Sequence, residues 1–190
     1  MAQVRPATPD DAQQWVATYL EALAHAYAPL LPPEFIVLQR RRVNQRVEEL
    51  RTALAPGPDS PDSPDSPDSP DSATSAWVAE DDLGMVAVAR TRRGPSAWEA
   101  ERGALTAGPE LQLQTLYALP RAHGTGLGQT LLDRAIGDRA AYLWLVQGNA
   151  RASAFYRRNG FVPDGVEVAG GPSWFGHLMI RHHREAVVCR

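Results

Sequence analysis

The chain has 190 residues, of which 44% are hydrophobic and 22% charged, and its formal net charge is −3. This composition allows one domain with a buried core, and it argues against a nucleic-acid-binding chain, which would carry a basic balance. No run of about 18 apolar residues is present, which argues against a membrane-spanning helix. Cys189 is the sole cysteine and the first eleven residues lack the apolar run of a secretory signal, so we expect a cytoplasmic protein without disulfides.

The first part of the sequence predicts one edge strand and two helices. Residues 3–5 form the strand candidate, and Thr8-Pro9-Asp10-Asp11 supplies an N-cap, a proline suited to the first helical position and acidic residues for the first turn. The apolar stripe of the helix that follows consists of Ala12, Trp15, Val16, Tyr19, Leu20, Leu23 and Tyr27. Three prolines between residues 29 and 33 end this helix, and apolar residues at helical spacing predict a second helix over 43–54.

Arginines gather at the start of the second predicted helix. They are Arg40, Arg41, Arg42 and Arg46. Such clusters usually form the solvated face of a helix, and this is the interpretation that the sequence favours. The alternative, a position near an anionic ligand, stays open at this point.

Residues 56–74 contain a repeat that interrupts the domain. It consists of five consecutive Pro-Asp-Ser triplets at Pro58–Ser72. A proline at every third residue rules out a helix interior and a central strand. The triplets contain no apolar side chain, so ordering them would cost entropy without compensation. We predict a disordered or polyproline-II-like surface insertion over 56–74, within a single domain that spans residues 1–190.

The spacing of apolar residues changes after the insertion. Residues 76–80 and 85–90 are compatible with strands joined by a hairpin turn. Residues 92–109 are rich in Gly, Pro, Arg and Glu, which predicts a loop. The elements expected after this loop are a strand at 111–119, a helix at 127–136, a strand at 142–146, a helix at 152–158, and strands at 162–168 and 174–181.

A glycine-rich turn, Pro120–Gly128 (PRAHGTGLG), follows the strand at 111–119 and opens the helix at 127–136. Glycines let the backbone approach a ligand closely, and free amides at a helix N-terminus attract phosphate. Taken alone, the motif suits a mononucleotide, a dinucleotide or coenzyme A. It is not a P-loop because no lysine follows Gly128, and its late position in the chain is unlike that of a dinucleotide-binding fold.

A second motif lies in the segment Leu143–Phe161, LWLVQGNARASAFYRRNGF. Its residues Asn149, Ala152, Phe155, Tyr156, Gly160 and Phe161 match the pattern Asn-x-x-Ala-x-x-Phe-Tyr-x-x-x-Gly-Phe. Together with the glycine-rich turn, this pattern resembles the GCN5-related N-acetyltransferase (GNAT) superfamily over residues 75–181. The resemblance implies an α/β fold of the α+β kind, a mixed sheet whose fourth and fifth strands splay apart to admit the pantetheine arm of acetyl-coenzyme A (acetyl-CoA).

The resemblance also implies roles for individual residues. Tyr117 and Ala118 would offer backbone groups to the pantetheine arm, and Asn149 would hydrogen-bond the arm or its neighbouring backbone. Tyr156 would donate a proton to the departing thiolate, which makes it the expected catalytic acid. The expected pyrophosphate ligands are the backbone amides of Gly124, Thr125, Gly126, Leu127, Gly128 and Gln129. Alternative roles are a helix N-cap for Asn149 and a core aromatic for Tyr156.

The sequence departs from the family pattern in three places. The family's (Gln/Arg)-x-x-Gly-x-(Gly/Ala) turn can begin at Arg121 or at His123, and the spacing to the helix favours His123. Gln112 and Trp144 stand where many relatives keep a glutamate, so both usual general bases are missing. The base candidates that remain are Glu110, Tyr117, His177 and a chain of water molecules.

These observations predict transfer of an acetyl group from acetyl-CoA to a primary amine by direct attack, without a metal, since no histidine pair shows a zinc spacing. The acceptor, a small-molecule amine or a protein N-terminus, is expected against the N-terminal helices and residues 92–109. Aromatic candidates for its pocket are Trp15, Tyr19, Tyr27, Phe35 and Trp98. Neither nucleic acid nor a membrane is expected as a partner, and a homodimer stays open. The competing hypotheses are a non-catalytic CoA-binding or regulatory module and a nucleotide-binding α/β domain.

Overall fold

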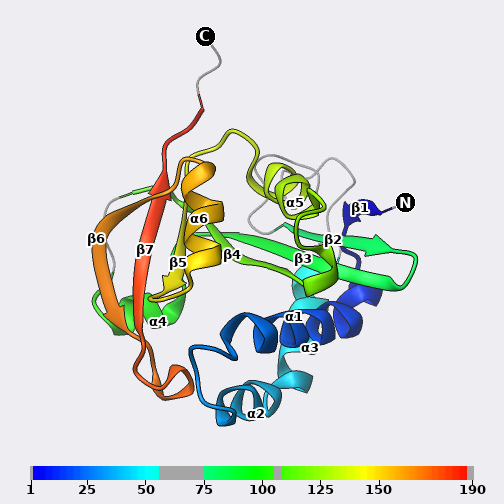
Figure 1. The fold of residues 1–190 in the computed structure, drawn as a ribbon, viewed down its shortest axis with the longest axis horizontal. Helices are drawn as coiled ribbons and strands as arrows, with labels where there is room; N and C mark the ends of the chain where they lie inside the picture. Colours follow the sequence, from blue (N-terminus) through cyan, green and yellow to red (C-terminus); the bar gives the residue numbers. More distant parts are fainter. Residues whose placement is uncertain (1, 56–74, 105–107, 188–190) are drawn as a thin grey trace.

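The computed structural model describes residues 2–55, 75–104 and 108–187, so the predicted insertion at 56–74 and Cys189 lie outside the described residues. The strands within these ranges are β1 (Gln3–Pro6), β2 (Ala76–Asp81), β3 (Gly84–Arg93), β4 (Leu111–Ala118), β5 (Ala141–Val146), β6 (Val162–Ala169) and β7 (Leu178–Arg184). They form one mixed sheet in the order β1-β2-β3-β4-β5-β7-β6 (Figure 1). Neighbouring strands are antiparallel except β4 and β5, which run parallel, as the predicted mixed sheet requires.

Helices cover both faces of this sheet (Figure 1). They are α1 (Ala12–Tyr27), α2 (Glu34–Arg40), α3 (Val43–Leu54), α4 (Ala97–Glu101), α5 (Leu127–Ile136) and α6 (Ala150–Arg158), with single 3-10 turns at Pro9–Asp11, Pro120–Ala122 and Pro172–Trp174. The helices α1 and α3 bury Leu23 and Leu50 in one core layer, whereas α5 buries Leu131 and Leu132 in the other. None of the helices in the described ranges is long and apolar enough to cross a membrane.

The strands β4 and β5 separate soon after they meet. Gln112 and Tyr142 are the only registered pair between them in the described residues, although β4 has eight residues and β5 has six. A β-bulge also interrupts β4, because Leu113 and Thr115 face consecutive residues of β3 and leave Gln114 without a partner there. The splay that the sequence predicts between the fourth and fifth strands is therefore confirmed.

Two helices are not predicted by the sequence. Helix α2 begins directly after Pro32 and Pro33, which we interpreted only as helix breakers, although proline also suits the first turn of a helix. Helix α4 lies inside the predicted loop at 92–109, and there Ser96 and Glu99 form a capping box. The last strand is displaced as well, to Leu178–Arg184 instead of 174–181, because a 3-10 turn precedes it. The other predicted elements lie where the sequence places them.

Arg5 ties β1 to the start of α1 and to β2. Its guanidinium donates to the two carboxylate oxygens of Asp11 at 2.7 and 2.8 Å and to Glu80 at 2.9 Å. The hydrogen bond from Arg5 lowers the pKa of Asp11 from 3.8 to about 2, against the opposing effect of partial burial. The ionised form of Asp11 is therefore favoured by folding.

We expect Asp11→Asn to lower the free energy of unfolding at pH 7 by about 1 kcal/mol, a value discounted for solvent screening because the Arg5 side chain is 31% exposed. Since the pKa of Asp11 is lower in the folded chain than in the unfolded chain, this stabilisation is complete above about pH 4 and is lost as the pH falls towards about 2. Urea denaturation of wild type and variant at several pH values checks this. A difference that persists unchanged at pH 2 would contradict it.

Candidate functional site

A cavity of about 410 Å³ lies beside β4, the glycine-rich turn and helix α6. We call it the turn cavity, and its lining residues are Ala26, Leu116, Tyr117, Ala118, Ala122, His123, Gly124, Gly126, Gly128, Gln129, Asn149, Arg151, Ala152, Phe155, Tyr156 and Arg158. Of the site residues predicted from the sequence, Thr125 and Leu127 are not in its lining, and all the others are. Two motifs that are separate in the sequence therefore meet at one cavity.

The glycine-rich turn presents backbone amides at this cavity. Gly124 and Gly126 have φ values of 78° and 88°, in the left-handed region that side chains other than that of glycine seldom adopt. Within the described residues neither of their amides donates a hydrogen bond. The amides of Gly128 and Gln129 lie in the first turn of α5, where a helix offers them no carbonyl partner. Such a set of free amides at a helix N-terminus can hold a phosphate group.

Replacing Gly126 by alanine is expected to lower the free energy of unfolding by about 1–2 kcal/mol. The added Cβ would meet no atom within 4 Å, so the loss comes from the left-handed backbone alone. The matched control is Gly128→Ala, whose Cβ would lie in ordinary contact with Phe155 inside α5, and which should be neutral or slightly stabilising. Urea denaturation distinguishes the two variants, and equal stabilities would contradict the backbone argument.

His123 and Arg121, the two alternatives for the first position of the motif, have different surroundings. Arg121 forms an ion pair with Asp81 at 2.8 Å and does not line the turn cavity. His123 does line it, and its Nε2 lies 3.1 Å from the carbonyl oxygen of Ala118 and 2.5 Å from Nη1 of Arg151. One nitrogen cannot donate to the carbonyl and accept from the guanidinium at once, so the tautomer selects one partner. The geometry favours the register that begins at His123.

Helix α6 contributes Asn149 and Tyr156. The side-chain oxygen of Asn149 accepts a hydrogen bond from the amide of Ala152 at 3.1 Å, which is the N-cap role considered for it. The ring of Tyr156 packs between those of Phe155 and Phe161, with centroids at 5.2 and 5.6 Å. Burial and, to a smaller extent, the neighbouring Tyr27 raise the pKa of the Tyr156 hydroxyl. The phenol therefore keeps its proton at neutral pH.

A second cavity, of about 340 Å³, lies towards α1, α2 and α3. We call it the aromatic cavity, and its lining residues are Tyr19, Tyr27, Gln39, Arg42, Arg46, Ser96, Trp98, Arg102, Gln112, Leu113, Gln114, Tyr117, Trp144, Gly171, Ser173, Trp174 and Met179. Three of the five aromatic residues proposed for an acceptor pocket are among them, whereas Trp15 and Phe35 are buried in the core. Tyr117 lines both cavities, so they are neighbours at this residue.

Tyrosine side chains surround this meeting point. The hydroxyls of Tyr27 and Tyr117 lie 3.4 Å apart, and the ring of Tyr19 meets the edge of Tyr117 at a centroid distance of 5.3 Å. Burial first, and then the neighbouring Tyr27, raise the pKa of Tyr117 well above its ordinary value. Because a phenol with a raised pKa is protonated at neutral pH, Tyr117 is poorly suited to be the base. Glu110 and His177, the other two candidates, line neither cavity.

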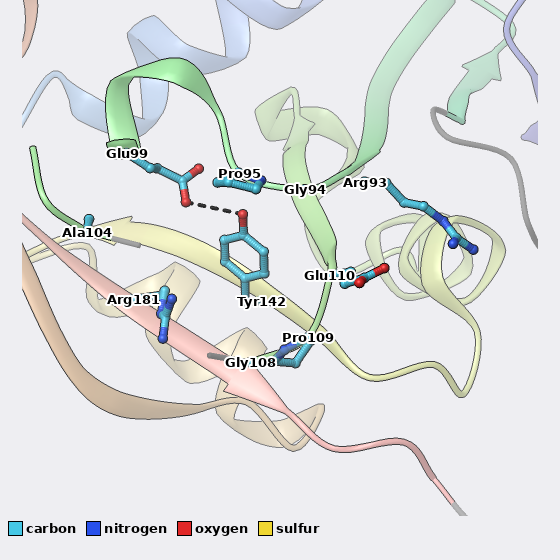
Figure 2. Close-up of a pocket in the computed structure, with 10 residues that line it drawn as sticks. All are labelled: Arg93, Gly94, Pro95, Glu99, Ala104, Gly108, Pro109, Glu110, Tyr142 and Arg181. Carbon is cyan, nitrogen blue, oxygen red and sulfur yellow. Dashed lines mark hydrogen bonds between the residues drawn. The ribbon is translucent and has the colours of Figure 1, made fainter. Parts of the chain in front are cut away.

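Glu99, which sequence reasoning missed, lies beside a third cavity, of about 430 Å³ (Figure 2). Its carboxylate is buried and accepts hydrogen bonds from the amide of Ser96 at 2.9 Å, from Nε2 of Gln112 at 2.9 Å and from the hydroxyl of Tyr142 at 3.1 Å. Figure 2 shows the Tyr142 hydroxyl directed at Glu99. Since Ser96 and Gln112 also line the aromatic cavity, Glu99 orients part of its wall. The Ser-x-x-Glu capping box was the signal that could have found this residue.

Metal ligands do not gather anywhere in the described part of the chain, where no group of three or more His, Cys, Asp or Glu side chains could hold an ion. The two neighbouring cavities instead offer hydrogen-bond donors, free amides and aromatic surfaces. On one side, free amides and a protonated phenol face the turn cavity. On the other, arginine and aromatic side chains face the aromatic cavity.

Part of the chain is similar to a known family. Residues 72–163 match the family model of an acetyltransferase (GNAT) domain. The solved PaiA N-acetyltransferase from Thermoplasma acidophilum, in complex with coenzyme A, is similar to the chain at 15% identity, covering 98% of this chain and 99% of that chain with a TM-score of 0.66. No curated protein matches the sequence.

Two further solved structures are similar along nearly the whole chain. The histone acetyltransferase HPA2 and related acetyltransferase from Corynebacterium glutamicum has 24% identity, a TM-score of 0.58, and covers 99% of this chain and 98% of that chain. The ribosomal-protein-S18-alanine N-acetyltransferase from Escherichia coli has 16% identity, a TM-score of 0.58, and covers 100% of this chain and 97% of that chain. At these identities the likeness shows the fold.

Proposed function

Because residues 72–163 match the model of an acetyltransferase (GNAT) domain and the fold is that of solved acetyltransferases, we propose that the chain transfers an acetyl group from acetyl-CoA to the primary amine of an acceptor. The observation that carries the proposal is the meeting of two cavities at Tyr117. One cavity has the free amides that a pyrophosphate needs, and the other is open to a second molecule. A reaction between two substrates requires such a junction, where their reacting atoms can approach.

The turn cavity is the proposed site of coenzyme A. Its pyrophosphate would be held by the amides of Gly124 to Gln129, with His123 at the mouth of the turn. Its pantetheine arm would pass the backbone of Tyr117 and Ala118, where β4 separates from β5, and would reach Asn149. The PaiA protein, which shares the fold, was solved in complex with coenzyme A, and this supports the assignment.

The proposed reaction is direct attack of the amine on the thioester carbonyl that acetyl-CoA supplies. A carbon–nitrogen bond forms, the carbon–sulfur bond breaks, and the amine loses the proton that the departing thiolate finally gains. Tyr156 lines the turn cavity and holds its proton at neutral pH, so its hydroxyl is the proposed donor to the thiolate. Backbone amides along the separated part of β4 would stabilise the oxyanion.

The general base is the unusual part of this proposal. Gln112 and Trp144 both line the aromatic cavity, and its described lining residues include no aspartate, glutamate or histidine. We propose that water accepts the amine proton. The same observation favours a second candidate, a non-catalytic module that binds coenzyme A on this fold.

The test combines binding and turnover. Thiol release from acetyl-CoA is measured with a panel of primary amines, while thermal shift compares coenzyme A, ATP and NAD. Protection by coenzyme A together with amine-dependent thiol release is the expected result. Protection without release on any amine would support the non-catalytic module. Protection by ATP or NAD instead of coenzyme A would overturn both and favour a nucleotide-binding domain.

A further inference from the structure

Three arginines and no carboxylates are found in the lining of the aromatic cavity, as far as the structure describes it. Arg42 and Arg46 come from the region of α3, and Arg102 follows α4. The rest of the lining is dominated by tyrosine and tryptophan rings, with several glutamines. The cavity therefore combines positive charge with aromatic surface.

Arg46 is fixed in place yet incompletely bonded. Its Nη2 donates to Oε1 of Gln39 at 2.6 Å, and its guanidinium carbon lies 5.5 Å from the centroid of the Tyr19 ring. Its Nε is buried and has no hydrogen-bond partner among the described residues. A buried donor without a partner costs free energy, so the hydrogen bonds that the described residues supply do not fully satisfy this guanidinium.

The other two arginines are bonded to neutral groups. Arg42 donates to the side chain of Gln45 at 3.1 Å, and Arg102 donates to the carbonyl of Ala169 at 3.0 Å. No ion pair of the described residues includes Arg42, Arg46 or Arg102. The buried carboxylate of Glu99, behind the wall, accepts from Ser96, Gln112 and Tyr142 instead. The positive charge of the cavity is thus left for a ligand to balance.

Arg46, at the charged end of the aromatic cavity, lies close to Tyr117, where the two cavities are neighbours. The ring of Tyr19 contacts both Arg46, whose guanidinium carbon lies 5.5 Å from the ring centroid, and Tyr117, whose ring centroid lies 5.3 Å away. The guanidinium and Tyr117 therefore share Tyr19 as a common neighbour. A small molecule can span this separation with an anionic group at one end and an amine at the other.

We infer that the acceptor is a small amine that also carries a carboxylate, namely an amino acid with an apolar or aromatic side chain. This inference rests on the proposed acetyl transfer. The carboxylate would bind at Arg46 and the amine would lie at Tyr117, while the side chain packs among the tryptophan rings. The same charges disfavour polycationic acceptors such as polyamines and aminoglycosides.

Matched pairs of amines test the inference, because each pair differs only in the carboxylate. The kcat/KM for thiol release is compared between L-phenylalanine and 2-phenylethylamine, and between L-tryptophan and tryptamine, with spermidine as a polycation. We expect the acid of each pair to be preferred about tenfold or more, as a charge-assisted hydrogen bond provides. Arg46→Gln should lower the ratio of the kcat/KM of the acid to that of the amine by about the same factor in each pair.

Arg51→Gln is the matched control, since Arg51 lies on the same helix, is 45% exposed and is outside the cavity. Binding of 3-phenylpropionate, which has the carboxylate but no amine, is measured by calorimetry and should be lost in Arg46→Gln only. The inference is overturned if the kcat/KM values within each pair are equal, or if Arg46→Gln binds 3-phenylpropionate as wild type does. Turnover of the amines would still support acetyl transfer in that case. Absence of turnover on every amine defeats the proposed function itself.

Discussion

Replacing Tyr156 by phenylalanine is expected to lower kcat for acetyl transfer by about 10²-fold or more, with little change in the KM for acetyl-CoA. The substitution removes one hydroxyl and keeps the ring packed between Phe155 and Phe161. Burial raises the pKa of this hydroxyl, so at neutral pH it is a donor and not an anion. Steady-state thiol release with a reactive amine measures the change.

A second tyrosine provides the control for this prediction. Tyr142→Phe removes the hydroxyl of a buried residue that lines neither the turn cavity nor the aromatic cavity, so kcat should change little. The melting temperatures of both variants show whether the fold is retained. If Tyr156→Phe keeps the wild-type kcat, Tyr156 is a core aromatic and the proposed proton transfer is wrong.

Replacing Glu99 by alanine is expected to lower the free energy of unfolding by about 3 kcal/mol or more. The change leaves the amide of Ser96, Nε2 of Gln112 and the hydroxyl of Tyr142 without their acceptor, and it removes the capping box of α4. Because Ser96 and Gln112 line the aromatic cavity, the KM for the acceptor should also rise. Urea denaturation and steady-state kinetics measure the two effects.

Glu101→Ala is the matched variant for this experiment. Glu101 ends the same short helix and is exposed, so its loss should change stability by less than about 0.5 kcal/mol. A Glu99→Ala variant as stable as Glu101→Ala would show that the buried carboxylate does not organise this region.

The residues of the turn cavity can be picked out from the sequence because they form two short local patterns. The glycines of the turn and the spacing of Asn149 and Tyr156 on one helix depend on neighbouring residues only. The structure brings these two patterns to one cavity. The splay of β4 and β5 also follows, since the resemblance carries it and the single registered pair Gln112–Tyr142 confirms it.

The aromatic cavity could not be predicted in the same way, because residues from distant parts of the chain build it. Arg46 lies beside Tyr19, and Trp174 contacts Tyr27 and Phe35, across long separations in sequence. The sequence favours a solvated helix face for the arginine cluster. The structure instead places two of its four members, Arg42 and Arg46, in the lining of a cavity. A run of charged residues in the sequence does not indicate whether their side chains face solvent or a cavity.

Polar residues also make one helix and the end of one strand difficult to predict. Helix α4 has five residues in a segment rich in charge, and only its capping box indicates a helix. The end of β7 buries Arg181, His182 and Arg184, which a pattern of apolar residues does not detect. Partners compensate the burial of the two arginines, since Arg181 pairs with Asp164 at 2.6 Å and the guanidinium of Arg184 lies 5.4 Å from the centroid of the Phe161 ring.

Acetyl transfer itself is tested most directly by following the acetyl group. The protein is incubated with acetyl-CoA labelled with carbon-13 in the acetyl group and with the amino acids and amines described above. Mass spectrometry then detects the products while free thiol is counted. The account predicts one labelled N-acetyl amide for each thiol released, formed on an amino acid. Coenzyme A that binds while no amine becomes labelled would contradict it.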